Sequence, residues 1–289
     1  MIGVKVQGRL GNQLFQYAFA FATAKKNNSS FYLDQNNTRF IAIQYFKIPL
    51  NTSLFLQQLV FNRLSFKFSV LERFYYNTLS KCIALNNVCI PVESVYNDYE
   101  DLLKDQTLFE GFFLSPNFFK DYAKEVKHLF SVKNKYVKTY QRKYGHIFNQ
   151  YKIATVHVRR SDYLNLGNFN LGNDDLTVPI EYYHQVIKSI SDKDVLFVFI
   201  SDDIEFIKKE FAYVENKLIS DDDLINDFQH LLNAEICVTA NSTFSWWGAW
   251  LNAHPQKKVY APKYFLGHFI KTCWPPEIYP DDWILVDTD

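Results

Sequence analysis

The chain has 289 residues, 48% of them hydrophobic, and its 31 basic and 31 acidic side chains give a formal net charge of zero. The length suits two domains of roughly 100–200 residues, the hydrophobic share excludes a disordered chain, and the zero charge argues against nucleic-acid binding through a global positive field. The sequence shows no signal-peptide pattern and no apolar run of the ~20 residues that a membrane span needs. We therefore expect a cytoplasmic protein, and peripheral association with the inner membrane face is an alternative.

The first elements predict the start of an open α/β sheet. Alternating apolar residues at 2–6 indicate a strand, and a polar turn follows at 7–11. Apolar residues then recur at helical spacing up to Lys26, and the stretch 29–35 indicates a second strand. This order is the usual opening of a doubly wound sheet.

The middle of the chain is less regular. Residues 40–150 are rich in Phe, Tyr and Asn, and their periodicity is mixed. Within them, 108–111 indicates the end of a strand, and the charged, amphipathic stretch 123–145 indicates a helix that leads to a domain boundary. The predicted domains are therefore 1–150 and 151–289.

Strands and helices alternate in the second half, which predicts a second doubly wound domain with ligands at the carboxyl ends of its strands. The near-continuous apolar run at 194–203 suits a parallel strand buried on both faces. The predicted strands are 152–158, 194–203, 214–220, 236–241 and 257–262, and the predicted helices are 179–190, 204–211, 223–235 and 242–253.

The cysteines, Cys82, Cys89, Cys237 and Cys273, form no C-x-x-C pair and no zinc spacing with histidines. We interpret them as buried thiols in a reducing compartment. The sequence also has no G-x-x-x-x-G-K-[ST], G-x-G-x-x-G, G-x-S-x-G or H-E-x-x-H pattern, so several common phosphate, dinucleotide and hydrolase signatures are missing.

The strongest chemical motif is HVRRSDY at 157–163, where a buried strand ends. Arg159 and Arg160 follow the strand, and Asp162 is close behind them. The planar guanidinium group is a donor fork that suits phosphate, so two arginines here predict a receptor for a dianion. The alternative is a surface salt bridge between Asp162 and one of the arginines.

The second motif is TANSTFSWWGAW at 239–250, in which Ser242 and Thr243 fall where a helix begins. Free backbone N–H groups and the helix dipole bind anions well at such a position. The alternative is an ordinary N-cap. We interpret the three tryptophans of this stretch as core packing.

Asp227 lies beside an apolar stripe in the predicted helix 223–235. It is either part of a solvated helix face or a carboxylate that accepts hydrogen bonds from N1–H and the exocyclic amino group of a guanine. The sequence also has two acidic stretches, Asp202-Asp203 and 221–223, and the second contains a D-x-D pattern of the kind that holds Mg²⁺ or Mn²⁺. Such short matches are common, and we expect no metal, since arginines and a helix N-terminus can neutralise a diphosphate.

Together these residues resemble glycosyltransferase family 11, the α-1,2-fucosyltransferases, in its soluble bacterial form. G-x-x-G-N-Q with F-Q-Y-A after it (8–18), H-x-R-R-x-D (157–162) and A-N-S-T-F-S-W-W (240–247) match in this order, although 40–150 contributes little. The combination is specific, whereas one motif alone is weak. The family is also distantly similar to α-1,6- and protein O-fucosyltransferases, which share the arginine motif. Arg9, where many members have Gly, is a minor departure.

The resemblance implies an α/β fold of GT-B type, with two Rossmann-like doubly wound domains facing a cleft. Residues 1–150 would form the acceptor side and 151–289 the GDP-fucose-binding side. The implied activity is that of a galactoside α-1,2-fucosyltransferase. It moves L-fucose with inversion from GDP-fucose to the 2-hydroxyl of a galactose-terminated oligosaccharide or glycan, as in surface-glycan or O-antigen synthesis, with no cofactor or metal.

Carried over residue by residue, the resemblance implies that Arg159 grips the β-phosphate and that His157 lies near the nucleoside. Asp227, sixteen residues before Thr243, is placed to bind guanine, and Thr243 with the Phe244 backbone N–H falls at the phosphates. The remaining expected donor-binding residues are Arg160, Asp202, Asn241 and Ser242.

The opening turn supplies the other expected site residues. The expected rim at a strand end consists of Gly11, Asn12 and Gln13. The side-chain amides of Asn12 and Gln13 are expected to bind the β-phosphate, the fucose or the acceptor, and Asn12 is also a candidate catalytic residue. Gly8 and Gly11 let the backbone approach the donor closely. Asp162 is the candidate catalytic base, although it could instead only orient an arginine.

Other readings stay open. The enzyme could form a different linkage or use a different GDP-sugar, or the protein could bind a sugar or nucleotide without catalysis. The sequence indicates neither the natural acceptor nor the oligomeric state.

Overall fold

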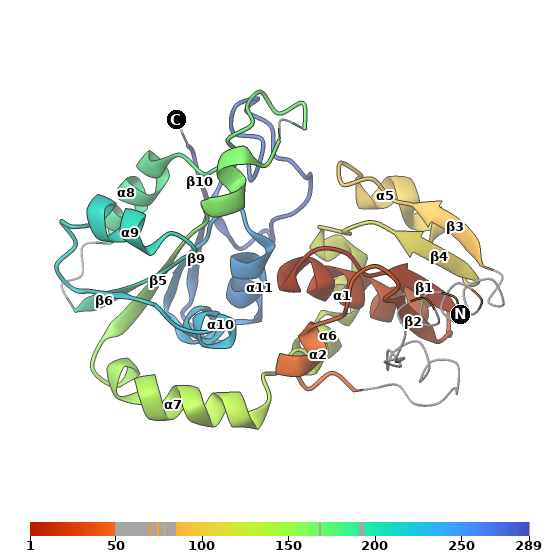
Figure 1. The fold of residues 1–289 in the computed structure, drawn as a ribbon, viewed down its shortest axis with the longest axis horizontal. Coiled ribbons are helices and arrows are strands. Elements are labelled where there is room, and N and C mark those ends of the chain that lie inside the picture. Colours follow the sequence, from red (N-terminus) through yellow and green to blue (C-terminus); the bar gives the residue numbers. More distant parts are fainter. Residues whose placement is uncertain are drawn as a thin grey trace. The chain divides into compact units, whose positions relative to one another are not determined.

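The computed structural model describes residues 1–49, 70, 74, 78, 85–167, 169–190 and 194–288. They form two compact units: unit 1 is Met1–Ser131 with Pro276–Ile278, and unit 2 is Val132–Pro275 with Tyr279–Asp289 (Figure 1). The division falls earlier than the predicted boundary after residue 150. None of the described helices combines the length and apolar character needed to cross a membrane.

Unit 1 contains a parallel sheet whose described strands have the order β2-β1-β4-β3. The central strand β1 pairs on both sides, with Ile2 opposite Phe31 of β2 and Thr107 of β4. Helix α1 packs its buried aromatic side chains under this sheet, and the rings of Phe19 and Phe113 stack with centroids 3.8 Å apart. The helices and strands are β1 (Ile2–Lys5), α1 (Leu10–Lys26), β2 (Phe31–Asp34), α2 (Ala42–Tyr45), β3 (Asn86–Cys89), α5 (Tyr96–Tyr99), β4 (Thr107–Glu110) and α6 (Ala123–Leu129).

Unit 2 contains a parallel sheet of described strand order β10-β9-β8-β5-β6-β7. The chain runs outward from β5 to β7 and then crosses to β8 on the other side, so the order reverses between β5 and β8. Ligands of doubly wound sheets bind at the carboxyl ends of the strands at such a reversal. The elements are α7 (Asn134–Phe148), β5 (Lys152–Val158), α8 (Ile180–Ser189), β6 (Val195–Ser201), α9 (Ile204–Glu210), β7 (Lys217–Ile219), α10 (Leu224–Asn233), β8 (Ile236–Val238), α11 (Thr243–Leu251), β9 (Lys258–Pro262) and β10 (Ile284–Val286).

Helices cover both faces of the second sheet: α8 and α9 lie on one face, and α10 and α11 on the other (Figure 1). Alternate residues of β5, such as Val156, pack with α8 and α9, so the intervening residues, including His157, face α10 and α11. Trp246 and Trp247 are 1% and 0% exposed, which confirms their interpretation as core. The predicted α/β class with parallel sheets is confirmed.

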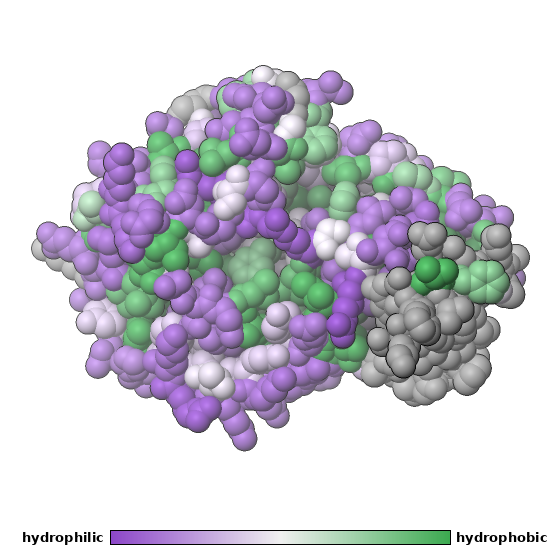
Figure 2. All heavy atoms as spheres, viewed as in Figure 1, coloured by the Kyte–Doolittle hydropathy of each residue, from purple (hydrophilic) through white to green (hydrophobic). Residues whose placement is uncertain are grey.

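Helix α7 explains why unit 2 begins before the predicted boundary. The predicted helix 123–145 is two helices, and the second of them, α7, packs on α10: the Tyr140 hydroxyl lies 2.9 Å from Nδ1 of His230, and the Tyr144 ring packs on the same imidazole. The opposite side of α7, along the lower edge of the view, is hydrophilic (Figure 2). The helix therefore belongs to the unit whose core it covers.

The cysteine prediction is confirmed only in part. Cys237 is buried, but Cys273 is half-buried and Cys89 is exposed at the end of β3, so the interpretation as a buried thiol is wrong for Cys89. Cys82 lies outside the described residues. The strand β10 was not predicted, because its three residues carry too short a pattern.

Candidate active site

Most of the predicted donor-binding residues lie at the carboxyl edge of the sheet in unit 2. The strands β6, β5 and β8 are neighbours, with Val158 opposite Ser201 and Val156 opposite Val238. Because parallel strands end at the same edge, the segments that follow these strands meet there. These segments hold 159–162, 202–203 and 241–244, and His157 lies within β5, one residue before its end.

Arg159 lies between two carboxylates. Its Nη2 donates to Oδ1 of Asp162, and its Nη1 is 2.9 Å from Oδ2 of Asp202. The guanidinium carbon is also 5.5 Å from the centre of the Tyr163 ring. The salt bridge between Arg159 and Asp162, which the sequence left as an alternative, is thus present. Arg159 forms a second salt bridge with Asp202. The side chain of Arg159 is 17% exposed, so it remains accessible at the strand end.

Arg160 has different partners from Arg159. Its backbone N–H donates to Oδ1 of Asp202 at 2.9 Å, and its Nε donates to Oδ2 of Asp203 at 3.3 Å. Its guanidinium carbon lies 3.7 Å from the centre of the Phe206 ring, a close cation–π contact with α9. The two guanidinium groups therefore do not form one symmetrical fork in this structure.

His157 is a buried, neutral imidazole. Burial, followed by the charge of Arg159, lowers its pKa to about 3, and its side chain is packed 5.6 Å, ring centre to ring centre, from Phe244. Its Nδ1 has no hydrogen-bond partner among the residues that the structure describes. A buried polar atom without a protein partner is costly, and it marks a position where water or a ligand can bind.

The start of α11 is capped. Ser242 is the N-cap, and its Oγ accepts a hydrogen bond from Phe244 N at 3.4 Å. Ser242 is therefore an N-cap, as the alternative interpretation predicted. At 3.4 Å this hydrogen bond is long and weak, so it competes only weakly with an anion for the Phe244 N–H. Asn241 is 0% exposed and donates from Nδ2 to the carbonyl of Leu176 at 2.6 Å. This places Asn241 beneath the site, where it fastens a loop.

Asp227 is not on a solvated helix face. Its Oδ1 accepts a hydrogen bond from the Ser220 hydroxyl at 2.5 Å, and burial raises its pKa to about 6. Its neighbour Phe228 packs on Phe244 with ring centres 5.4 Å apart, which links α10 to the start of α11. Sequence reasoning missed Ser220, whose only signal was its place directly after the strand β7.

Two residues of the acidic stretch 221–223 stabilise α10 and its contact with α7. The Asp222 carboxylate accepts hydrogen bonds from Lys143, Tyr144 and Asn226. Burial alone would raise the pKa of Asp222, but these bonds lower it below its usual range. Asp223 is the N-cap of α10 and accepts from Asn226 N at 2.9 Å. Asp222 and Asp223, two of the three acidic residues of this stretch, are therefore engaged within unit 2.

The opening turn of unit 1 is built around its own side chains. Gly8 has a φ of +69°, and a Cβ there would lie 2.5 Å from Nδ2 of Asn12. Gln13 is 1% exposed; its Nε2 donates to the carbonyls of Gly8 and Arg39, and its Oε1 accepts from Ile41 N. Because all its amide groups are engaged in the interior, Gln13 is a scaffold residue, which corrects its prediction as a rim ligand.

Gly11 is also buried, inside the first turn of α1, which begins at Leu10 rather than after the glycine. It therefore does not offer an open backbone to a ligand. Asn12 is half-buried, with its side chain over Gly8. Of the three predicted rim residues, Asn12 is the one whose side chain remains accessible.

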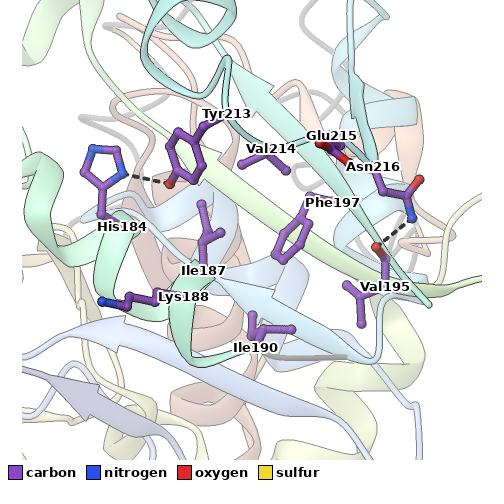
Figure 3. A pocket seen from close by; sticks show the side chains of 10 residues that line it. All are labelled: His184, Ile187, Lys188, Ile190, Val195, Phe197, Tyr213, Val214, Glu215 and Asn216. Carbon is purple, nitrogen blue, oxygen red and sulfur yellow. Dashed lines mark hydrogen bonds between the residues drawn. The ribbon is translucent and has the colours of Figure 1, made fainter. Parts of the chain in front are cut away.

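A cavity of about 850 Å³ lies elsewhere in unit 2, between α8, the start of β6 and the segment before β7 (Figure 3). Its lining includes apolar side chains such as Phe197, and His184 Nδ1 lies 2.8 Å from the Tyr213 hydroxyl at its margin. Val195 begins β6, whereas the candidate residues follow Ser201 at its end. The cavity and the candidate site are thus at opposite ends of the strand.

The two parallel α/β units define a glycosyltransferase fold of GT-B type. The fold is similar to that of NodZ from Bradyrhizobium, an α-1,6-fucosyltransferase co-crystallized with GDP, with a TM-score of 0.53, 13% identity and coverage of 86% of this chain and 91% of that chain. It is also similar to Arabidopsis thaliana FUT1 in complex with GDP, with a TM-score of 0.50, 15% identity and coverage of 90% and 70%.

The chain belongs to glycosyl transferase family 11, whose model matches residues 1–287. An alpha-1,2-colitosyltransferase of Escherichia coli is 23% identical over 304 residues, covering 99% of both chains. The O-antigen biosynthesis glycosyltransferase WbnK of Escherichia coli is 27% identical over 293 residues, covering 91% of this chain and 94% of the relative. The resemblance seen in the sequence motifs is therefore confirmed, and the protein is a fucosyltransferase-like glycosyltransferase.

Proposed function

We propose that the protein is an inverting fucosyltransferase that moves L-fucose from GDP-fucose to the 2-hydroxyl of a terminal galactoside. The observation that carries this proposal is Arg159, a side chain that is 17% exposed and follows β5 at the edge where the sheet order reverses; α11 follows the neighbouring strand β8 at the same edge. Family membership and the GDP-bound state of NodZ and FUT1 support a GDP-sugar as donor. The O-antigen relative supports a surface glycan as acceptor.

In this proposal the donor is held mainly by groups of unit 2. Arg159 and the first N–H groups of α11, at Thr243 and Phe244, bind the diphosphate, and Asp227 binds the guanine edge. The neutral His157, whose Nδ1 has no hydrogen-bond partner among the described residues, packs against Phe244 and adds a polar contact without adding charge. These groups come from the end of β5, the segment that follows it, and the first turns of α10 and α11.

The chemistry follows from where charge develops. The galactose 2-hydroxyl oxygen attacks the anomeric carbon of fucose, the bond from that carbon to the β-phosphate oxygen breaks, and GDP leaves with the electron pair. The hydroxyl proton passes to the Asp162 carboxylate, our candidate base. Fixed donors at Arg159 and α11 stabilise the leaving diphosphate, and one such donor is typically worth ~10²–10³ in rate. Attack from the face opposite GDP converts the β-linked donor into an α-linked product.

A second donor is favoured by one relative. The alpha-1,2-colitosyltransferase spans 99% of this chain, and colitose is L-fucose without its 3-hydroxyl. The two donors would share every diphosphate and guanine contact described above. They would differ only at one sugar hydroxyl, so a direct comparison of GDP-fucose with GDP-colitose decides between them.

A transfer assay tests the proposal. We expect purified protein to form a trisaccharide from lactose and GDP-fucose, and Arg159→Ala to lower kcat by about 10²–10³ through loss of one transition-state donor. The matched control is Arg142→Ala, which removes an exposed arginine of α7 in the same unit. Near-normal turnover by Arg159→Ala would remove Arg159 from the site, and transfer of colitose but not fucose would favour the second donor.

A further inference from the structure

The two carboxylates that flank Arg159 come from different elements. Asp202 follows the end of β6, the strand next to β5, and Asp162 lies three residues after Arg159 in the short 3₁₀ segment Ser161–Asn165. Each carboxylate takes a different terminal nitrogen of the guanidinium: Asp202 takes Nη1, and Asp162 takes Nη2. Arg159 therefore has one partner on the sheet and one on the following loop.

Asp202 is fixed at more points than its contact with Arg159. Its Oδ1 accepts the Arg160 backbone N–H at 2.9 Å, while Oδ2 lies 2.9 Å from Arg159 Nη1. Its main-chain carbonyl accepts the Ser161 hydroxyl at 3.3 Å. These contacts tie the end of β6 to the end of β5, directly after the paired residues of the two strands. Its side chain is only 20% exposed.

Asp162 is the more exposed partner. Its side chain is 40% exposed, and its bond to Arg159 is a local contact between residues three apart in the chain. One guanidinium charge faces two carboxylate charges, so this side of the strand end carries a local excess of negative charge. An incoming diphosphate is repelled by that excess unless one carboxylate leaves its place on Arg159.

We propose that Asp202 and Asp162 have different roles at Arg159. Asp202 is a positioning residue that holds the guanidinium both before and after the donor binds, and Asp162 is a counter-ion that the donor diphosphate displaces. The inference rests on the proposed function and extends it. Displacement frees the Asp162 carboxylate at the moment when the donor arrives. A base that becomes available only then favours binding of the donor before the acceptor.

Two isosteric variants should change donor affinity in opposite directions. In Asp202→Asn the amide oxygen can still accept a hydrogen bond from the Arg160 backbone N–H. The amide NH₂ then faces Arg159 Nη1, and because both groups are hydrogen-bond donors, the bond to Arg159 is lost. We expect about 10- to 100-fold weaker GDP binding, the usual range for losing a charge-assisted hydrogen bond. Asp162→Asn removes a competitor for Arg159, so GDP affinity should be unchanged or higher while kcat falls.

Titration calorimetry with GDP measures both effects, and Glu205→Gln, an exposed carboxylate of α9, is the matched control that should bind GDP normally. A double-mutant cycle shows whether Asp202 acts through Arg159: in an Arg159→Ala background, Asp202→Asn should change affinity by less than about twofold. Thermal unfolding checks that each variant is folded. If Asp202→Asn fails to fold, Asp202→Glu is the second variant, because it keeps the charge on a longer side chain. Its GDP affinity should lie between those of the wild type and Arg159→Ala.

The inference is overturned if Asp202→Asn binds GDP like wild type, if its loss persists in the Arg159→Ala background, or if Asp162→Asn weakens GDP binding as much as Asp202→Asn does. Failure of the proposed function looks different. In that case the wild-type protein itself binds no GDP and transfers no fucose. Normal wild-type transfer with any of the three outcomes above refutes the division of roles alone.

Discussion

Replacing Asp227 with Asn should stabilise the protein and at the same time weaken binding of the donor. The carboxylate is partly buried, and its pKa is raised to about 6 from an ordinary 3.8 by burial, with only a partial offset from the Ser220 hydroxyl. The folded protein therefore holds this proton more tightly than the unfolded chain does. Ionised Asp227 destabilises the fold above about pH 6, and the cost is relieved as the pH falls from about 6 to about 4.

The shift of about two units sets an upper limit of about 3 kcal/mol, at about 1.4 kcal/mol per unit. Asn keeps an oxygen for the Ser220 hydroxyl, so we expect Asp227→Asn to raise the free energy of unfolding by about 1–3 kcal/mol near pH 7.5 and to change it little near pH 4. Denaturant unfolding at both pH values measures this gain. A loss of stability near pH 7.5 would refute the reasoning about burial.

Binding should change in the opposite direction, because only the ionised carboxylate accepts both guanine N–H groups. In the wild type, about a tenth of Asp227 is ionised near pH 5, so donor affinity should fall about tenfold between about pH 7 and 5. GDP-fucose is the better probe, since the terminal phosphate of GDP itself titrates near pH 6. Asp227→Asn should bind weakly and without this pH dependence. A wild-type affinity that is flat from about pH 7 to 5 would contradict the assignment.

Three further outcomes are expected. Gly8→Ala should lower the free energy of unfolding by about 1–3 kcal/mol in a thermal or denaturant melt, because the residue has a positive φ and its Cβ would meet the Asn12 amide; an unchanged melt would show that the turn relaxes without cost. Asn12→Ala should raise one Michaelis constant more than the other, that of GDP-fucose if Asn12 contacts the donor and that of lactose if it contacts the acceptor, and equal values to wild type in both would exclude contact with either. Transfer should persist in excess EDTA, since guanidinium and helix N–H groups supply the positive charge at the diphosphate; loss of activity that Mn²⁺ restores would refute this.

The carboxyl ends of β5 and β9 lie where the sequence predicts them, whereas β6 and β8 end at Ser201 and Val238, before their predicted ends at 203 and 241. The apolar run of β5 stops at Val158, so the arginines had to follow a buried strand, and β5 has the predicted bounds. The partner of Arg159 could not be predicted in the same way. Asp202 reaches it only because Val158 pairs with Ser201 in the sheet, and no local pattern encodes that register.

The roles of polar side chains could not be predicted from the sequence, because the same side-chain amide can bind a ligand or form hydrogen bonds with buried main-chain groups. Gln13 and Asn12 are adjacent in one motif, yet Gln13 is buried among main-chain carbonyls and Asn12 is half-buried over Gly8. The limits of unit 2 also depend on tertiary contacts. Helix α7 precedes the predicted boundary, but its tyrosines pack on His230 of α10, which amphipathic periodicity alone does not reveal.

The central claim is that the protein transfers L-fucose with inversion from GDP-fucose to the 2-hydroxyl of galactose. NMR analysis of the trisaccharide formed from GDP-fucose and lactose tests it most directly. We predict an α-configured fucose attached to the galactose 2-hydroxyl. A fucose on another hydroxyl, a β-configured product, or no trisaccharide across a panel of galactosides would contradict the claim.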